Sequence, residues 1–243
     1  TEGHHRDELV QIAEKFISQK VDGVFFQPLE LHPGSEGTNE SVARLLAENN
    51  VPVVMLDADY LPFPDCSQFD LVGIDNIRAG FIATRHLLNQ GADRVDFVVR
   101  PFTAKSAILR KNGYRLALIE HNISPRPFWE HSINTEDVDS CGRLLESGAT
   151  DIVCVSDEAA ASLILSLEKL GVSVPDEIRL VGFDDLKYAH LLRVPLTTMR
   201  QPCAKIGELA FETMLSRIRK PDLPGRKIFI DAELVKRRSS GHL

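Results

Sequence analysis

Two adjacent carboxylates, Asp184 and Asp185, end an apolar run over residues 178–183. Such a run is typical of a buried strand in a parallel sheet. The helical apolar pattern over 163–170, which stops at Gly171, precedes it. Ligands of open parallel sheets bind beyond the carboxyl ends of strands, so these carboxylates are candidate hydrogen-bond acceptors for a ligand. The alternative is that they begin a turn or cap the next helix.

The same pattern occurs earlier in the chain, where the apolar run 51–56 ends in Asp57. Apolar periodicity and turn residues predict regular alternation of strands and helices. Strands are expected over 24–26, 51–57, 71–74, 95–99, 128–133, 151–155, 178–183 and 227–236, and helices over 8–20, 40–49, 77–90, 107–121, 136–148, 157–171 and 203–219.

This alternation predicts an α/β protein with parallel sheets flanked by helices. Strand-end carboxylates in both halves favour two lobes with a cleft between them. We expect residues 1–71 with 202–226 to form the N-terminal lobe, and 72–201 with 227–243 to form the C-terminal lobe.

Composition excludes several classes of protein. The net charge of −7 argues against nucleic-acid binding by bulk electrostatics. The four cysteines, Cys66, Cys141, Cys154 and Cys203, form no Cys-x-x-Cys pair, which leaves zinc knuckles and redox motifs unsupported. Cys154 lies in an apolar run and is expected to be a buried thiol. With no apolar run long enough for a bilayer and no signal peptide at the start, we expect a cytoplasmic protein without membrane contact.

Enzymatic activity is not expected. Carboxylates adjacent on a strand end point apart, which disfavours joint acid–base work by Asp184 and Asp185. The chain has no Gly-x-Ser-x-Gly, no His-Glu-x-x-His and no phosphate-binding Gly-rich loop, and its histidines are scattered. We therefore predict no catalytic residues, no metal and no cofactor.

An ordered series of motifs covers nearly the whole chain. The chain resembles the effector-binding core of the LacI/GalR family of bacterial transcription regulators, which is itself similar to periplasmic sugar-binding proteins. The series comprises Val21-Asp22-Gly23-Val24, residues 51–57, Gly73-Ile74-Asp75-Asn76, residues 110–114, Ser156-Asp157-Glu158-Ala159-Ala160, residues 174–178, Val181-Gly182-Phe183-Asp184-Asp185, residues 195–202 and 233–237.

The resemblance implies a two-lobed periplasmic-binding-protein-like fold that binds a small effector, expected to be a sugar, in the cleft between its lobes. It also implies a homodimer and control of operator DNA through an N-terminal domain. That domain, and the first strand, helix and strand of the family's core, have no counterpart here, so we expect a truncated chain. The alternative function is that of a periplasmic sugar-binding protein serving a transporter.

Sugar hydroxyls need acceptors and paired donors. The resemblance places Arg110 on a helix facing the cleft, where its guanidinium could donate to two oxygens. Asp57 and Asp184 are the expected acceptors. Ser156, which replaces the family's usual Asn, is the preferred contact over Asp157, which could equally be a helix N-cap.

Aromatic side chains could provide a plate for a sugar ring. Trp129 and Phe102 are candidates, although aromatic side chains more often belong to a core. Asn134, in the loop after the expected strand over 128–133, is a further candidate contact.

Overall fold

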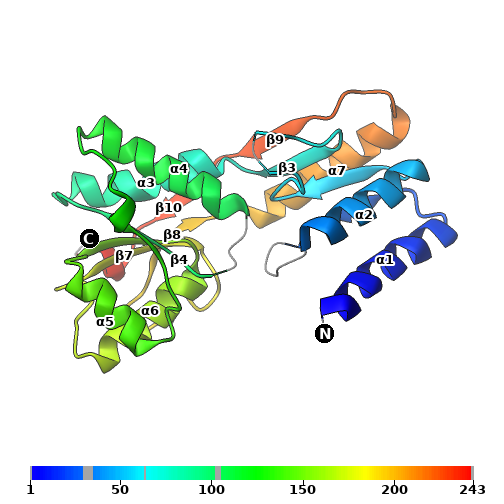
Figure 1. Ribbon diagram of the computed structural model, residues 1–243. Coiled ribbons are helices and arrows are strands. Elements are labelled where there is room, and N and C mark those ends of the chain that lie inside the picture. Colours follow the sequence, from blue (N-terminus) through cyan, green and yellow to red (C-terminus); the bar gives the residue numbers. More distant parts are fainter. Residues whose placement is uncertain (1, 30–34, 63, 102–104, 242–243) are drawn as a thin grey trace. The chain divides into compact units, whose positions relative to one another are not determined.

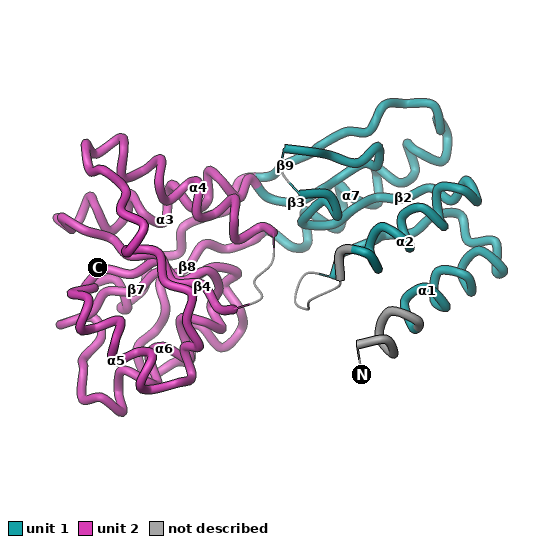
Figure 2. Tube along the Cα trace, in the orientation of Figure 1, with its two compact units in different colours: residues 1–74, 202–230 teal, residues 75–201, 231–243 magenta. Residues whose placement is uncertain are grey.

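The computed structural model describes residues 2–29, 35–62, 64–101 and 105–241. The chain divides into two compact units, Thr1–Ile74 with Pro202–Ile230 and Asp75–Gln201 with Asp231–Leu243 (Figure 2). Each unit is a sheet flanked by helices, so the predicted α/β class is confirmed. Among the described residues no helix is both long enough and apolar enough to span a membrane.

Unit 1 contains a parallel sheet in the order β1-β2-β3-β9. Its elements are α1 (Glu2–Ser18), β1 (Val24–Phe26), α2 (Ser35–Glu48), β2 (Val53–Leu56), β3 (Asp70–Ile74), α7 (Cys203–Arg219) and β9 (Lys227–Ile230). Side chains alternate across the strands. Val53 and Met55 pack with α1 and α2, whereas Val54 packs with α7 on the opposite face (Figure 1).

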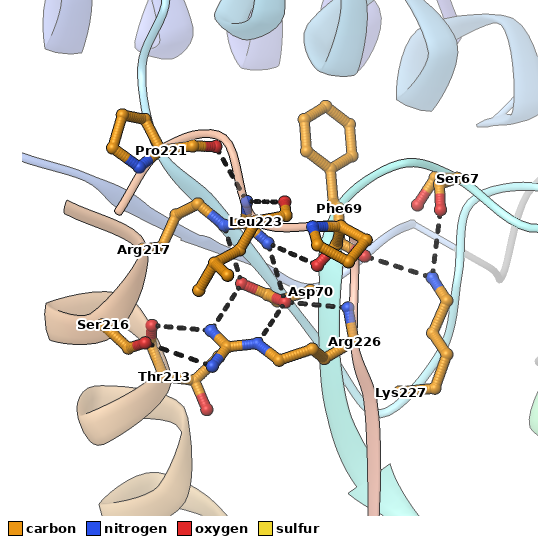
Figure 3. A network of polar contacts seen from close by, with 11 residues as sticks. Ser67, Phe69, Asp70, Thr213, Ser216, Arg217, Pro221, Leu223, Arg226 and Lys227 are labelled. Carbon is orange, nitrogen blue, oxygen red and sulfur yellow. Dashed lines mark hydrogen bonds and ion pairs between the residues drawn. The ribbon is translucent and has the colours of Figure 1, made fainter. Parts of the chain in front are cut away.

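A buried carboxylate, Asp70, joins β3 to the end of α7 and to the segment leading into β9 (Figure 3). Arg217 donates to both of its oxygens, from Nε at 2.9 Å and Nη2 at 3.0 Å. Arg226 donates from its backbone nitrogen at 2.9 Å, from Nε at 3.0 Å and from Nη2 at 3.1 Å. Burial alone would raise the pKa of Asp70, but the hydrogen bonds from Arg226 and Arg217 outweigh burial and lower the pKa to about 2.

Unit 2 contains a sheet in the order β10-β8-β7-β6-β4-β5. Its elements are α3 (Asn76–Asn89), β4 (Asp96–Val99), α4 (Lys105–Glu120), β5 (Glu130–Ser132), α5 (Val138–Glu146), β6 (Asp151–Cys154), α6 (Asp157–Lys169), β7 (Arg179–Asp184), β8 (Thr197–Arg200) and β10 (Glu233–Val235), with short 3₁₀ turns at Pro127–Trp129 and Arg238–Ser240. Helices α3 and α4 flank one face of the sheet, and α5 and α6 flank the other (Figure 1). Cys154 is fully buried against α5 and α6, as predicted.

The C-terminal strand differs from its prediction. The expected strand over 227–236 is two strands, and β9 pairs with β3 in unit 1 whereas β10 pairs with β8 in unit 2. β10 is also antiparallel to β8, whereas the sequence predicted parallel sheets. The expected lobe boundary had placed 227–230 in the C-terminal lobe. The break at Asp231-Ala232 separates the strands, and apolar periodicity does not reveal it.

Two glycines allow α3 and α4 to touch along their backbones. A Cβ on Gly80 of α3 would collide with the carbonyl oxygen of Arg110, and one on Gly113 of α4 would collide with the carbonyl oxygen of Ile77. Since backbone cannot move aside as a side chain tip can, these two positions fix how closely the helices approach.

Replacing Gly113 by alanine is expected to destabilise unit 2 by about 1–3 kcal/mol, because the helices must separate. Gly142 in α5 is a matched control, since a Cβ there meets nothing within 4 Å. Gly142→Ala should instead stabilise the protein by about 0.5–1 kcal/mol through helix propensity. Urea unfolding of both variants measures the difference, and equal effects would contradict the close-packing argument.

Candidate functional site

Arg110 is a buried cation beside the carboxyl ends of β6 and β7, with only 5% of its surface exposed. Its Nε donates to Oδ1 of Asn76 at 2.8 Å, and Nη1 donates to the carbonyl oxygen of Val155 at 2.8 Å. The guanidinium carbon lies 4.6 Å from the centre of the Phe183 ring, within cation–π range. These contacts from α3, β6 and β7 hold the guanidinium in one orientation.

Asp184 faces the remaining edge of that guanidinium. Its Oδ1 lies 3.6 Å from Nη2 of Arg110, which is an ion pair but is longer than a hydrogen bond. The same oxygen accepts a 2.7 Å hydrogen bond from Nε2 of Gln201. Asp184 has a φ of 108° and Asp185 a φ of 54°, in the left-handed region that side chains other than glycine rarely adopt. Such strain is concentrated at functional sites.

Asp185, in contrast, is fully engaged by the protein. Nε of Arg200 lies 2.7 Å from one of its oxygens, and Nη2 of Arg237 lies 2.6 Å from the other. Burial would raise the pKa of Asp185, but these two hydrogen bonds prevail and lower it. Asp185 therefore ties the end of β7 to β8 and to the segment after β10, and Asp184 is the carboxylate that can face a ligand.

Ser156, and not Asp157, caps helix α6. The N-cap of α6 is Ser156, whose Oγ accepts from the backbone nitrogen of Ala159 at 3.2 Å. Asp157 is completely buried, and its oxygens accept from Oγ1 of Thr198 at 2.6 Å and from the backbone nitrogen of Leu186 at 2.8 Å. Ser156 is half-buried at the carboxyl edge of the sheet, so its role as a ligand contact stays a prediction.

Burial raises the pKa of Asp157 to about 7, and nearby Asp184 and Asp185 add to the rise, whereas the Thr198 and Leu186 hydrogen bonds oppose it. Because the folded state then holds a proton that the unfolded chain releases near pH 4, this residue's contribution to stability declines as the pH rises from about 4 to about 7.

Replacing Asp157 by asparagine is expected to remove that dependence. An amide can keep both hydrogen bonds, with its oxygen accepting from Leu186 and its nitrogen donating to Thr198. The variant should therefore gain stability over the wild type as the pH rises from about 4 to about 7, by up to about 1.4 kcal/mol per pH unit. Melting curves across this range measure the difference, and a constant offset between the two proteins would contradict it.

The other residues of unit 2 that were predicted to contact the ligand do not lie beside Arg110 and Asp184. Trp129 precedes β5, so it lies at the amino edge of the sheet, where it stacks with Arg94 at 5.4 Å, opposite the edge that carries Asp184. Asn134 does follow β5 at the carboxyl edge, but β4 and β6 lie between β5 and β7. Its Oδ1 accepts from the backbone nitrogen of Glu136 at 3.1 Å. Phe102 lies outside the described residues.

Asp57 belongs to unit 1, where it follows β2 with a φ of 65°. Its backbone nitrogen donates to the carbonyl oxygen of Val72 at 3.0 Å. A Cβ on Gly73 of the neighbouring strand β3 would approach the Asp57 backbone to 3.1 Å, so glycine permits this close approach. The carboxylate therefore does stand at a strand end, and its role as an acceptor for the ligand stays a prediction.

Asn76, Phe183 and Gln201 contact Arg110 or Asp184, and none of the three was singled out from the sequence. Asn76 is the first residue of α3, directly after the N-cap Asp75, whose Oδ1 accepts from the Arg78 backbone nitrogen at 2.9 Å. All three follow or belong to motifs that carry the family resemblance, which was the only signal available for them.

A family model described as a periplasmic binding protein-like domain matches residues 84–240, which is more than half of the chain. The chain belongs to this family. Among curated relatives, the HTH-type transcriptional repressor PurR of Vibrio campbellii is 29% identical over 239 residues, covering 96% of this chain and 67% of that protein. The ribose operon repressor of Escherichia coli is 27% identical, covering 93% and 67%.

Solved structures of regulators share the fold of this periplasmic binding protein-like domain. A complex of the transcriptional regulator CelR with cellobiose is 24% identical, with a TM-score of 0.81, covering 96% of this chain and 70% of that one. The transcription regulator CcpA of Lactococcus lactis is 24% identical, with a TM-score of 0.80, covering 96% and 83%. The expected resemblance is confirmed: the domain corresponds to the effector-binding core of LacI-type transcriptional regulators rather than to a transporter's binding protein.

Proposed function

We propose that this core binds a small polyhydroxylated effector, a sugar, through Arg110 and Asp184. The observation that carries the proposal is the buried guanidinium of Arg110, held by Asn76, Val155 and Phe183 and turned toward a strained carboxylate. Removing a guanidinium from water is costly unless its donors are used, and a ligand is what would use the donors beside Asp184.

The spacing of these two groups suits a hydroxyl. The 3.6 Å gap between Nη2 and Oδ1 leaves the ion pair without a direct hydrogen bond. A sugar hydroxyl can donate to the carboxylate and accept from the guanidinium at once, and both bonds would be charge-assisted. The hydrogen bond from Gln201 keeps Asp184 in place for this. Among the described residues Asp184 has one ion-pair partner, Arg110, so the proposal favours an unphosphorylated sugar.

Similar proteins support the sugar class. Two LacI-family regulators of this fold were solved with bound ribose, with TM-scores of 0.78 and 0.76, and CelR was solved with cellobiose. The curated relatives are named as transcriptional repressors, which supports a regulatory role with no catalysis. We infer that the effector controls binding to operator DNA through an additional N-terminal domain, and that the regulator acts in the cytoplasm as a homodimer.

A thermal-shift screen against pentoses, hexoses, disaccharides, their phosphates and purines tests the ligand class. A ligand that binds only the folded state raises the melting temperature with its concentration over Kd. An unphosphorylated sugar is expected to give the shift, and Asp184→Asn should abolish it. Glu136→Gln, which changes an exposed carboxylate beyond β5, should retain the shift.

A shift with purines alone, or one that Asp184→Asn leaves intact, would overturn the assignment. The melting temperature of each variant without ligand is the control for folding. For Glu136→Gln this temperature should stay close to that of the wild type, because the side chain is exposed.

A further inference from the structure

Helix α4 is apolar on two opposite sides. Its buried side faces the core of unit 2 and includes Tyr114 and Leu118. On the opposite side, Ile108 is 54%, Leu116 50% and Ile119 58% exposed. Their spacing along the sequence places these three on one side of the helix, in a row of about 16 Å. A single exposed apolar side chain is ordinary, but a helix that is apolar on both sides is usually covered.

Helix α3 adds an aromatic side chain and a cation beside this row. Phe81 lies where the two helices touch, since a Cβ on Gly113 would approach the Phe81 backbone nitrogen to 2.7 Å. The guanidinium carbon of Arg85 lies 5.1 Å from the centre of the Phe81 ring, within cation–π range. We use the term α3–α4 surface for the outward side chains Phe81, Arg85, Lys105, Ile108, Leu116 and Ile119.

The charge of α3 and α4 is opposite to that of the whole chain. The chain has a net charge of −7, whereas these two helices together carry six arginine and lysine side chains and one carboxylate, Glu120. The six are Arg78, Arg85, Lys105, Arg110, Lys111 and Arg115. Three of them form ion pairs with carboxylates of unit 2 and Arg110 is buried, whereas Arg85 and Lys105 lie beside the apolar row.

We propose that the α3–α4 surface binds an acidic helical segment of a partner protein. A partner helix of about three turns with one apolar side would cover the row of exposed aliphatic side chains. Carboxylates next to that apolar side would pair with Arg85 and Lys105. Nucleic acid suits the surface less well, because surfaces that bind it are strongly basic and polar at their centre.

The α3–α4 surface is separate from the proposed effector site. Arg110 belongs to the buried side of α4, whereas Ile108, Leu116 and Ile119 belong to the exposed side. The proposed partner contact therefore does not rest on sugar binding. Leu116→Asp should keep the sugar-induced thermal shift, so a failed ligand screen and a failed partner contact give different results.

Fluorescence anisotropy with two synthetic helical peptides of about 18 residues tests the proposal. Both peptides carry the same row of leucines, which is flanked by glutamates in one peptide and by lysines in the other. The glutamate peptide should bind about 10-fold or more tightly than the lysine peptide, and added salt should reduce this difference.

Leu116→Asp and Ile119→Asp should each weaken binding of the glutamate peptide by about 10-fold or more, since each places a carboxylate in the apolar row. Ile218→Asp is the matched control, because Ile218 is a 40% exposed isoleucine on helix α7 of unit 1. It should leave the affinity for the glutamate peptide unchanged.

A charge reversal separates recognition from a folding effect. The double variant Arg85→Glu with Lys105→Glu should bind the lysine peptide more tightly than the glutamate peptide, and loss of folding cannot produce that gain. Equal affinity of the wild type for both peptides, or an affinity for the glutamate peptide that Leu116→Asp leaves unchanged, would overturn the proposal. Binding to phosphatidylserine vesicles without binding to the glutamate peptide would also overturn it, and would assign the surface to membranes.

Discussion

Arg110→Lys is expected to weaken sugar binding by about 100-fold or more. The planar guanidinium donates to Asn76 and to Val155 while it keeps an edge toward Asp184, and it stacks on Phe183. A lysine ammonium is a point charge that cannot make these contacts together. Loss of about two charge-assisted hydrogen bonds of 1.5–3 kcal/mol each accounts for the expected effect.

Titration calorimetry with the sugar found in the screen measures this change. Arg115→Lys is the matched control, because Arg115 lies on the same helix but pairs with Glu130, at the amino edge of the sheet. It should alter affinity by no more than about twofold, as expected for a residue remote from the ligand. Comparable losses in the two variants would mean that α4 as a whole, and not the Arg110 guanidinium, determines binding.

Asp70→Asn is expected to destabilise unit 1 by about 3–5 kcal/mol, the usual effect of removing one partner from a buried ion network. Arg217 and Arg226 would lose the carboxylate to which both donate, although Arg217 keeps its bonds to the carbonyl oxygens of Pro221, Leu223 and Pro224. Helix α7 and strand β9 should therefore detach first.

Hydrogen exchange resolves this effect, because it reports each unit separately. Amides of β3, β9 and α7 should lose protection in Asp70→Asn, while those of β6 and β7 in unit 2 keep theirs. Asp222→Asn, at an exposed position in the segment after α7, should change neither set. Equal loss of protection in both units would show that Asp70 does not stabilise unit 1 specifically.

The pKa of Asp70 also predicts how acid acts on unit 1. The folded-state pKa of about 2 lies below the unfolded value near 3.9, so the carboxylate contributes its stability above pH 4. This contribution, roughly 2–3 kcal/mol, is lost as the pH falls from about 4 to about 2. Asp70→Asn should lack that loss, whereas Asp157 acts in the opposite direction and at higher pH.

Strand-end carboxylates were predictable from the sequence, because an apolar run that ends in aspartate has few structural interpretations. Choosing between Asp184 and Asp185 was not possible from the sequence. The choice depends on Arg200 and Arg237, which reach Asp185 from β8 and from the segment after β10, and local patterns carry no information about such partners. The backbone similarly decides that Ser156 caps α6 while Asp157 is buried.

Trp129 lies at the amino edge of the sheet both in the predicted strand over 128–133 and in the structure, where β5 begins at Glu130. Ligands of parallel sheets bind at the carboxyl edge, so the strand prediction itself already disfavoured this tryptophan as a ligand contact. The division of the C-terminal strand was not predictable in the same way. Residues 231–232 separate β9 from β10, which belong to different sheets, and the apolar pattern does not show this break.

The most direct test of the central claim is a double-mutant cycle between Asp184 and the ligand. Calorimetry would compare the sugar found in the screen with its monodeoxy analogues, on the wild type and on Asp184→Asn. For the hydroxyl that bridges Asp184 and Arg110, removal should weaken binding to the wild type by about 10-fold or more and should have little further effect on the variant. If every deoxy analogue loses the same affinity on both proteins, Asp184 does not contact the effector and the proposed site is wrong.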